Sequence, residues 1–305
     1  MENPFLSIVL CTYNGERFLK EQLDSLFNQT YENFEIIAVD DCSTDSTINI
    51  LQEMASPNKM KVFKNEKNEG VNRNFQIAIQ KASGDFILIC DQDDIWVPNK
   101  LEVLVSSIDG SLLYYHDSRL MDVNGKIQSK KMSDKYRMSS NPHPLAFISQ
   151  NGVTGHACMF DRKLLEYPIF PLPKHIYYDN WLGYIASIHG QVRYIDNCMV
   201  NYRVHENNLT ISQKKSRKLN EEISEAIYEQ LNSFYEFAHE NSGYKTFLLR
   251  LRNTYLSNTF LSKSKRVYLF LIQLKNLNFF RKKNIFRKIS FSIKMGYKPL
   301  PNYFL

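Results

Sequence analysis

The sequence predicts an α/β fold with a mostly parallel central sheet, on three observations. Apolar runs over residues 6–11, 34–39 and 86–90 have the length and composition of buried strands. Apolar residues at helical spacing separate these runs, which is the order expected of right-handed βαβ units. Polar residues follow each run directly, so the carboxyl ends of the three strands would share one edge of the sheet.

The first two strands are each followed by a polar loop and an amphipathic helix. Residues 6–11 lead into Thr12-Tyr13-Asn14-Gly15, and apolar residues then recur at helical spacing up to position 27. Residues 34–39 lead into Asp40-Asp41, and a second helical pattern covers positions 48–54. No GxGxxG or GxxxxGK[ST] motif follows a strand, so the usual dinucleotide and P-loop fingerprints are missing.

The third strand leads into the run Asp91-Gln92-Asp93-Asp94. Three carboxylates in four positions repel one another, so something must compensate their charge. A divalent cation with oxygen ligands, Mg²⁺ or Mn²⁺, would do so and would in turn bind a substrate phosphate. The alternative is an Asp-rich turn, because aspartate favours turns and helix caps.

Three later segments carry further signals. Residues 68–74 form a loop that feeds a helix, and a glycine-rich turn at 152–157 precedes a short strand at 158–160. Asp179 comes immediately before an apolar pattern at helical spacing, where an aspartate is a good N-cap. Residues 116–150 hold few signals and are interpreted as a variable excursion.

Seven segments, spread in order over about residues 5–210, together resemble one family. They are residues 7–15, 39–45, 68–75, 91–96, 155–160, 178–182 and 202–208. Their sequences are similar to family 2 glycosyltransferases of the GT-A fold, and most similar to bacterial rhamnosyltransferases of cell-wall and capsular polysaccharide synthesis. The resemblance implies a metal-dependent, inverting enzyme that moves a sugar onto a hydroxyl of a growing lipid-linked polysaccharide. The donor expected first is dTDP-rhamnose, which supplies L-rhamnose.

The resemblance assigns donor-binding roles to the polar loops. The residues expected to contact the nucleotide sugar are Thr12, Tyr13, Asn14, Asp41, Asn68, Asn72, Asp91 and Asp93. Among them, Asp41 would accept the N3–H of a pyrimidine base, a donor that uracil and thymine both offer. From the residues alone, an Asx turn at Asp41, core packing at Tyr13 and a capped turn around Asn68 and Asn72 remain open.

The resemblance also divides the catalytic work between two carboxylates. Asp93 is expected to bind the Mn²⁺ or Mg²⁺ directly, Asp91 to contact the metal or the ribose, and His205 to complete the metal shell. Asp179 is expected to be the general base that takes the proton from the acceptor hydroxyl. Arg203 is left open between binding phosphate and pairing with an acid.

Two residues are expected on the acceptor side, His156 and Trp181. Structural use of His156 is equally open on the sequence. The chain departs from many relatives beside the base, where Tyr178 and Asn180 stand in place of an acidic or histidine neighbour.

The composition is that of an ordinary globular protein, with 43% hydrophobic and 23% charged residues in 305. The five cysteines are scattered and odd in number, which argues against a disulfide framework or a zinc site and fits a reducing cytoplasm. The N-terminal residues show no signal peptide, and no apolar run approaches the roughly 18 residues of a membrane span. We therefore expect a cytoplasmic protein.

The charge is divided unevenly along the chain. No acidic residue follows Glu240, whereas positions 245–305 contain 14 Lys and Arg, which leaves 24 basic and 32 acidic residues, a net charge of −8, before them. We therefore expect a catalytic domain over 1–212, with a nucleotide-sugar half at about 1–100 and an acceptor half at about 101–212. A basic helical region would cover 213–305.

Two interpretations of the basic region stay open. It is either a helical subdomain packed on the catalytic domain or on a second copy in a homodimer, or a peripheral contact of 245–305 with the inner face of the cell membrane. Binding to nucleic acid is not expected, since no recognition motif is present.

Two alternatives to rhamnosyl transfer are also retained. The first keeps the fold and changes the donor to a UDP-hexose, for galactosyl or glucosyl transfer. The second is a nucleotidyltransferase or a nucleotide-binding protein, which would have no need of Asp179.

Overall fold

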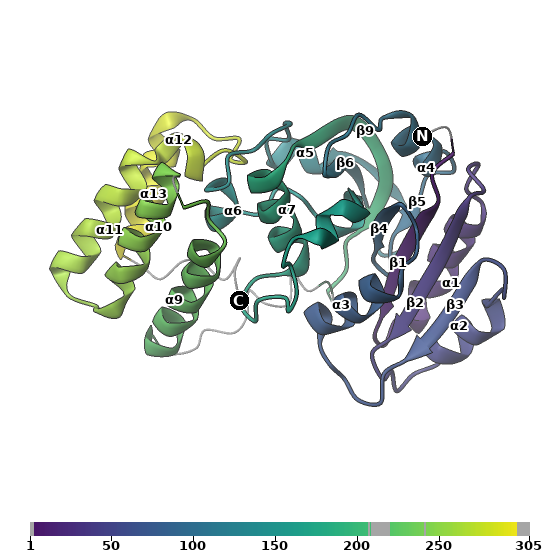
Figure 1. Cartoon of the computed structure of the whole chain (residues 1–305). Coiled ribbons are helices and arrows are strands. Elements are labelled where there is room, and N and C mark those ends of the chain that lie inside the picture. The colour runs from purple at the N-terminus through teal and green to yellow at the C-terminus, as the bar shows by residue number, and fades with distance from the viewer. Residues whose placement is uncertain (1–2, 207, 209–219, 241, 298–305) are drawn as a thin grey trace.

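A computed structural model of the chain describes residues 3–206, 208, 220–240 and 242–297 (Figure 1). The domain boundary predicted near residue 212 lies outside these residues. The strands are β1 (Leu6–Thr12), β2 (Phe34–Asp40), β3 (Met60–Lys64), β4 (Phe86–Cys90), β5 (Ile95–Trp96), β6 (Leu113–Met121), β7 (Ile127–Lys131), β8 (Cys158–Asp161) and β9 (Val192–Arg203). The α-helices are α1 (Glu16–Phe27), α2 (Thr47–Met54), α3 (Val71–Lys81), α4 (Lys100–Ser106), α5 (Met132–Lys135), α6 (Ala146–Ser149), α7 (Tyr178–His189), α9 (Asn220–Glu236), α10 (Gly243–Asn253), α11 (Phe260–Ile272), α12 (Leu274–Leu277) and α13 (Ile285–Tyr297). The 3-10 helices are η1 (Gly155–Ala157), η2 (Arg162–Glu166) and η4 (Thr254–Leu256).

One sheet runs through the described part of the chain, in the order β3-β2-β1-β4-β8-β6-β9-β5, with β7 paired to β6. Strands β3, β2, β1 and β4 are parallel, as the apolar runs predict. Strand β8 is antiparallel to both β4 and β6, β9 is parallel to β6, and β5 is antiparallel to β9. The sheet is therefore parallel over the first 90 residues and mixed beyond them, because β8 enters from the opposite end and β7 returns from β6 through a hairpin.

Both faces of the parallel part are covered by helices. Ile8 and Leu10 of β1 belong to a core cluster that includes apolar residues of α1, α2 and α4. Val9 points to the other face and joins a cluster with residues of α3 and α7. Alternate residues of a strand point to opposite faces, so a strand that is buried on both sides must be apolar throughout. This explains why the three strands read as continuous apolar runs.

The C-terminal helices share a core with the sheet. Figure 1 shows α9 to α13 at the end of the molecule away from β1, β2 and β3, with α6 and α7 in between. Phe234 of α9 packs on Trp181 and Tyr184 of α7, and the Tyr184 hydroxyl donates to the Phe234 carbonyl at 2.5 Å. Burying a phenylalanine contributes about 2–3 kcal/mol, so this contact ties α9 firmly to α7.

The helices do not have the features of membrane spans. None of those in the described residues combines the length and the apolar composition that crossing a bilayer requires.

Candidate active site

The carboxyl ends of β1, β2 and β4 lie side by side, as expected for parallel neighbours. Thr12 ends β1, Asp40 ends β2, and Asp91 follows β4 directly. Thr12 and Asp40 are partners in the sheet register, and the Thr12 hydroxyl donates a hydrogen bond to Asp40 Oδ1 at 3.0 Å. The polar loops that follow these strands therefore form one edge, and the candidate site lies along it.

Gln92 holds the loop that follows β1. The Tyr13 N–H donates to Gln92 Oε1 at 2.8 Å, and Gln92 Nε2 donates to the Tyr13 carbonyl at 3.1 Å. A Cβ atom on Gly15 would lie 2.3 Å from Gln92 Oε1, so a side chain at position 15 would displace Gln92 from these two bonds. The Tyr13 ring is exposed, and it is open to contact by a ligand at the edge.

Asn14 links the loop after β1 to the loop after β2. Its backbone has a positive φ of 46°, which asparagine tolerates better than most residues. Its N–H donates to Ser43 Oγ at 2.9 Å, and its side-chain oxygen accepts the N–H of Thr44 at 2.9 Å. Thr12 is buried. Thr12 thus shapes the edge from within, whereas Tyr13 and Asn14 are both exposed.

Asp41 lies buried directly after β2, at the same edge of the sheet. Its Oδ1 accepts hydrogen bonds from Asn65 Nδ2 and from the Glu69 N–H, both at 2.8 Å, and its Oδ2 accepts the Gly70 N–H at 2.9 Å. A carboxylate has about four acceptor sites, so one more donor can still be accommodated. Asn68 is exposed and bonds only locally in the described structure, accepting the Gly70 N–H at 3.1 Å.

Asn72 connects the first turn of α3 to the segment that leads into α7. Its Nδ2 donates to the carbonyls of Pro173 and Ile176 at 3.1 and 2.7 Å, and its Oδ1 accepts the Tyr178 N–H at 3.1 Å. These bonds use both amide protons. The side chain predicted to contact the nucleotide sugar therefore positions the start of α7.

The run after β4 divides into exposed and buried carboxylates. The Asp91 side chain is 35% exposed and that of Asp93 is 15% exposed, whereas Asp94 is fully buried. Partial burial raises the pKa of Asp91 to about 7, and the charges of Asp93 and Asp179 add to the shift. Only Asp91 and Asp93 can be reached by a ligand from solvent.

Asp93 and His205 lie together although 112 residues separate them. His205 Nε2 is 2.7 Å from Asp93 Oδ2, and Asn208 Nδ2 approaches the same oxygen at 3.4 Å. Buried Arg203 donates from Nε to the Asp93 carbonyl at 2.8 Å and pairs with Glu21 at 2.8 Å. Of the two roles left open for Arg203, the structure shows the acid pairing.

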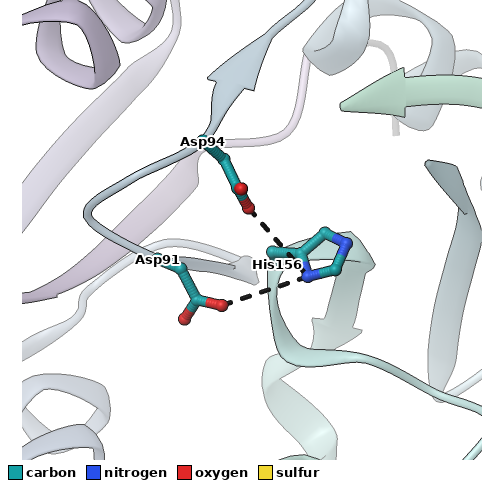
Figure 2. Close-up of side chains that lie close together, drawn as sticks. All are labelled: Asp91, Asp94 and His156. Atoms are coloured by element: carbon teal, nitrogen blue, oxygen red, sulfur yellow. Dashed lines mark ion pairs between the residues drawn. The ribbon is translucent and has the colours of Figure 1, made fainter. Parts of the chain in front are cut away.

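Asp94 faces a buried histidine on the other side of the run. Figure 2 shows Asp91 and Asp94 converging on His156, whose Nδ1 is 4.0 Å from Oδ2 of each. The other ring nitrogen, Nε2, lies 2.9 Å from Ser118 Oγ. Asp94 Oδ1 accepts the Arg203 N–H at 2.9 Å, and its Oδ2 has no hydrogen-bond partner among the described residues. Asp94 therefore holds the backbone of β9, and the N-cap of α4 is Asn99 and not Asp94.

A buried lysine lies behind this histidine. Lys100 Nζ donates to the His156 carbonyl at 2.9 Å and lies 3.4 Å from the centre of the Trp96 ring. Burial lowers the pKa of Lys100 to about 7 and that of His156 to about 3, and it raises the pKa of Asp94 well above its usual range. His156 is therefore neutral at physiological pH. With Nε2–H bonded to Ser118, its Nδ1 lone pair would face the two carboxylates.

These side chains fit a divalent cation of the Mg²⁺ or Mn²⁺ kind. One ligand atom from each of Asp91, Asp94 and His156 lies within 4.8 Å of the others, and the orphaned Asp94 Oδ2 is among the candidates. Asp93 and His205 form a second pair of potential metal ligands, and their side chains are partly exposed. Carboxylate oxygens suit both ions, and neutral imidazole suits Mn²⁺.

Asp179 is the second residue of α7. The N-cap of this helix is Tyr177, so the alternative of a capping Asp179 does not hold. Its Oδ1 accepts the Asn180 N–H at 2.7 Å and its Oδ2 accepts the Gly155 N–H at 3.1 Å. Burial raises its pKa to about 6 against the opposing effect of these bonds. A partly exposed carboxylate with this pKa is suited to take up a proton near neutral pH.

Tyr178 connects the helix of Asp179 to the acid run. Its hydroxyl hydrogen-bonds Asp91, and its ring lies 3.9 Å from that of Phe75 in α3. A Cβ atom on Gly155 would lie 2.2 Å from the Tyr178 hydroxyl oxygen, so the turn before β8 closes on this tyrosine. Tyr178, one of the two residues that depart from many relatives, thus links Asp179 to Asp91 of the acid run.

The two residues predicted on the acceptor side are both in the interior. Trp181 is 1% exposed, donates from Nε1 to the Ile169 carbonyl at 3.1 Å and packs on Phe234. His156 is 3% exposed and stacks on Tyr202. Their burial leaves almost no surface for an acceptor to contact, so Trp181 has a packing role and His156 lies behind the acids.

Three residues of this region were not predicted from the sequence. Gln92 and Lys100 stand within or just after the acid run, and Asn208 stands near His205. The only signal for them was their presence in or beside motifs already singled out. Their partners are 56 to 115 residues away, so the contacts depend on the tertiary fold.

The sequence matches a known family over more than half of its length. The family model described as Glycosyl transferase family 2 covers residues 7–167. The uncharacterized glycosyltransferase alr2836 of Nostoc sp. is 28% identical over 245 residues, 75% of this chain and 74% of that protein. The UDP-Glc:alpha-D-GlcNAc-diphosphoundecaprenol beta-1,3-glucosyltransferase WfgD of Escherichia coli is 28% identical over 188 residues, 61% of this chain and 72% of that protein.

Solved structures agree on the fold. S. aureus TarS 1-349 in complex with UDP-GlcNAc aligns with a TM-score of 0.63 at 18% identity, over 96% of this chain and 90% of that chain. The mannosyltransferase PcManGT from Pyrobaculum calidifontis, in complex with GDP-Man and Mn²⁺, aligns with a TM-score of 0.54 at 16% identity, over 98% and 77%. At these identities the likeness concerns the fold alone. The chain belongs to glycosyl transferase family 2 and has the GT-A fold.

Proposed function

We propose that this glycosyltransferase is inverting and metal-dependent, and that it moves a sugar from a pyrimidine nucleotide diphosphate to a hydroxyl of a lipid-linked saccharide. The observation that carries the proposal is the pairing of Asp179, with its pKa near 6, and the exposed acids Asp91 and Asp93 at one edge. Tyr178 joins the two sets through its bond to Asp91. A base and a phosphate-binding group therefore lie within reach of one substrate.

The chemistry divides between the two sets. Asp179 accepts the proton of the acceptor hydroxyl as its oxygen attacks the sugar carbon, while the bond to the nucleotide diphosphate breaks on the opposite side. Attack opposite the leaving group inverts the configuration at that carbon. The Gly155 and Asn180 N–H groups fix the carboxylate of the base in place. Asp91, Asp93 and His205 would hold the divalent cation, which supplies neutralisation of the charge that develops on the departing diphosphate.

We assign the cation to the exposed side because of access. A cation that also contacts a substrate diphosphate needs coordination positions open to solvent. Asp91 and Asp93 have partly exposed side chains, whereas Asp94 and His156 are closed off by the protein. Lys100 lies next to the closed pair, where its charged form opposes the burial that raises the pKa of Asp94.

For the donor, we propose dTDP-L-rhamnose, with a UDP-hexose as the second candidate. The first rests on the similarity of the motifs to rhamnosyltransferases, and the second is favoured by the UDP-Glc named for the relative WfgD. Both donors carry a pyrimidine whose N3–H can bond the remaining acceptor position of Asp41, beside the exposed ring of Tyr13.

For the acceptor, we propose a saccharide on a polyprenyl diphosphate. The name of WfgD specifies an acceptor on diphosphoundecaprenol, and that enzyme aligns with 61% of this chain. A nucleotidyltransferase or a mere nucleotide-binding protein, the alternative class, would leave Asp179 without a task.

A thermal-shift screen tests the donor and the metal together. The protein is heated with dTDP-rhamnose, UDP-glucose, UDP-galactose or GDP-mannose, the last as a purine control, each with Mn²⁺ or with EDTA. A ligand at 100 times its Kd adds about 2.7 kcal/mol and should raise Tm by several degrees. We expect this rise for a pyrimidine sugar with Mn²⁺ only. Equal shifts in EDTA would contradict metal dependence, and a shift with GDP-mannose alone would contradict the pyrimidine assignment.

A further inference from the structure

Exposed apolar side chains are concentrated in the C-terminal helices. Among the described residues, the large hydrophobic side chains classed as exposed number twelve, and ten of them lie between positions 256 and 297. The remaining two lie outside the C-terminal helices. Tyr13 is in the loop that follows β1, and Ile127 is in β7. Scattered exposed apolar residues are normal, but a concentration of this kind marks an interaction surface.

The exposed apolar residues follow the helical repeat on α11 and α13. On α11, Leu261, Tyr268 and Ile272 are exposed at spacings of seven and four, with exposed Lys265 on the same stripe. On α13 the corresponding exposed stripe contains Phe286, Ile293 and Tyr297. Residues three, four or seven apart share one face of a helix, so each helix presents an outward apolar stripe.

The two helices form one unit. A Cβ atom on Gly296 of α13 would lie 2.7 Å from the Val267 backbone nitrogen of α11, so glycine lets the helices approach closely. Their inner faces bury Leu269, Phe270 and Met295 in the core that they share with α7. The outer stripes therefore remain uncovered because of how the helices pack, and not because the helices are detached.

This unit is also uniformly basic. Residues 259–297 contain ten Lys and Arg and no Asp or Glu. Lys265, Lys283 and Lys294 are exposed on or beside the apolar stripes. A symmetric dimer through this face would place positive charge against positive charge. An anionic surface is the complement in both sign and polarity.

We infer that α11 and α13 together dock on an anionic lipid membrane, with the apolar stripes entering the headgroup region and the lysines contacting the acidic headgroups. Amphipathic helices with basic and aromatic residues bind membranes in this way. The inference rests on the proposed function for its purpose, since a lipid-linked acceptor lies in a membrane. Its test measures vesicle binding and is independent of sugar transfer.

The chain between the two docking helices contacts a segment that positions Asp179, the proposed general base. The Leu277 carbonyl, at the end of α12, accepts a hydrogen bond from Ser149, and Phe280 closes on Gly152 so tightly that a Cβ there would overlap its ring. Asn151 in the same loop hydrogen-bonds Asp179. The helices that would contact the membrane thus lie against the loop next to which an acceptor must enter.

Flotation of the full chain with vesicles tests the inference. Vesicles of phosphatidylcholine alone are compared with vesicles that also contain phosphatidylglycerol, at low and high salt. We expect binding only with the anionic lipid, and a decrease at high salt because screening shortens the reach of the lysines. Replacing Lys265, Lys283 and Lys294 by Gln should weaken binding by about a hundredfold, since each basic residue near an anionic leaflet contributes about fivefold.

Two further variants separate apolar insertion from charge alone. Tyr268→Ser with Phe286→Ser removes side chains that are 64% and 78% exposed, so the fold should survive, and vesicle binding should fall by about tenfold or more. The matched control replaces exposed residues of the catalytic part, Lys126→Gln and Lys130→Gln with Ile127→Ser, and should bind as the unchanged protein does.

The outcomes separate this inference from the proposed function. Every docking variant should retain metal-dependent transfer to a water-soluble acceptor, and circular dichroism should show an intact fold. Equal binding to neutral vesicles, no binding at low salt, or no loss in the lysine and aromatic variants would overturn membrane docking. Dimerisation that these same variants abolish, without vesicle binding, would also overturn it and assign the face to a second copy. None of these results would alter the assignment of Asp179.

Discussion

The acid run after β4 has an open side and a closed side, and the two differ in what surrounds their carboxylates. The open side consists of Asp91, Asp93 and His205, whose side chains are partly exposed. The closed side consists of Asp94, His156 and Lys100, which are buried, with Lys100 bonded to the His156 carbonyl. Asp91 contributes to both, because its carboxylate also lies near His156.

The difference shows how one short motif can do two jobs. A buried carboxylate must be compensated from within the protein or become neutral, and here a buried lysine and a raised pKa serve that purpose. A partly exposed carboxylate can be reached by a cation from solvent, which compensates its charge when bound. We therefore assign binding to the open side and support to the closed side. The following variants test that division, from the largest expected effect to the smallest.

Asp93→Asn should have the largest effect. The amide keeps the shape of the side chain and can still bond His205, but it removes the charge that binds the metal. Metal-supported nucleotide binding should fall by more than the roughly 100-fold upper value seen for supporting groups of metal sites. Calorimetric titration of nucleotide with and without Mn²⁺ measures the loss, and circular dichroism checks the fold. Unchanged metal dependence would show that the open side does not hold the cation.

Asp179→Asn should separate binding from chemistry. Transfer is expected to fall by about 10²–10⁴-fold, the usual contribution of a general base, while nucleotide and metal affinity stay nearly the same. The two are compared by turnover and by titration on one preparation. Near-normal turnover would require another base.

The pH dependence gives this variant an internal control. Because the pKa of Asp179 is raised to about 6, its carboxyl is protonated below that pH and cannot accept a proton. In the unchanged enzyme kcat/KM should therefore fall by tenfold per pH unit below about pH 6. The residual activity of the Asn variant should lack this limb.

His205→Ala should weaken Mn²⁺ affinity by about 10–100-fold, less than Asp93→Asn, because a carboxylate ligand remains. His239→Ala is a matched control, since His239 is exposed and its side chain contacts only surface groups of its own region, the Ile188 carbonyl and the His189 ring, in the described structure. Metal titration followed by nucleotide protection measures both variants. An equal loss in the two would mean that His205 acts through the fold and not as a ligand.

Asp94→Asn should have the smallest effect, below about threefold on Mn²⁺ affinity. The amide oxygen can still accept the Arg203 N–H. Because the folded pKa of Asp94 is raised, the stabilising contribution of this group is lost as pH rises through that pKa. The Asn variant has no carboxyl that titrates at this position and does not lose this contribution. Its free energy of unfolding in denaturant, relative to that of the unchanged protein, should therefore increase with pH. Loss of metal binding here would place the cation on the closed side.

The sequence predicted the parallel half of the fold and the positions of the acidic residues at its edge. It predicted less of the contacts that the site residues make. Apolar runs and acids at strand ends are local signals, so β1, β2 and β4 and the edge beyond them could be predicted. Asp93 and His205, which the resemblance expects to bind the same metal, lie next to each other in the structure. The contacts of Asn72 could not be predicted, because its partners lie about 100 residues away.

Burial explains the remaining differences. Trp181 and His156 stand in motifs of the family, yet their depth is set by helices and strands far along the chain. The directions of β8 and β9 likewise depend on long connections, and no local pattern distinguishes a parallel from an antiparallel strand when both faces are covered.

The contact between Gly15 and Gln92 ties the evolution of one loop to that of another. An alanine at position 15 would overlap the Gln92 side chain, although its φ of −107° would suit any residue. A side chain at 15 would therefore displace the end of Gln92 and break its two hydrogen bonds to the Tyr13 backbone. A smaller residue at 92 would release the backbone of Tyr13. Among related sequences these two positions should vary together, and a designer who changes nucleotide preference through Tyr13 has to treat the three as one unit.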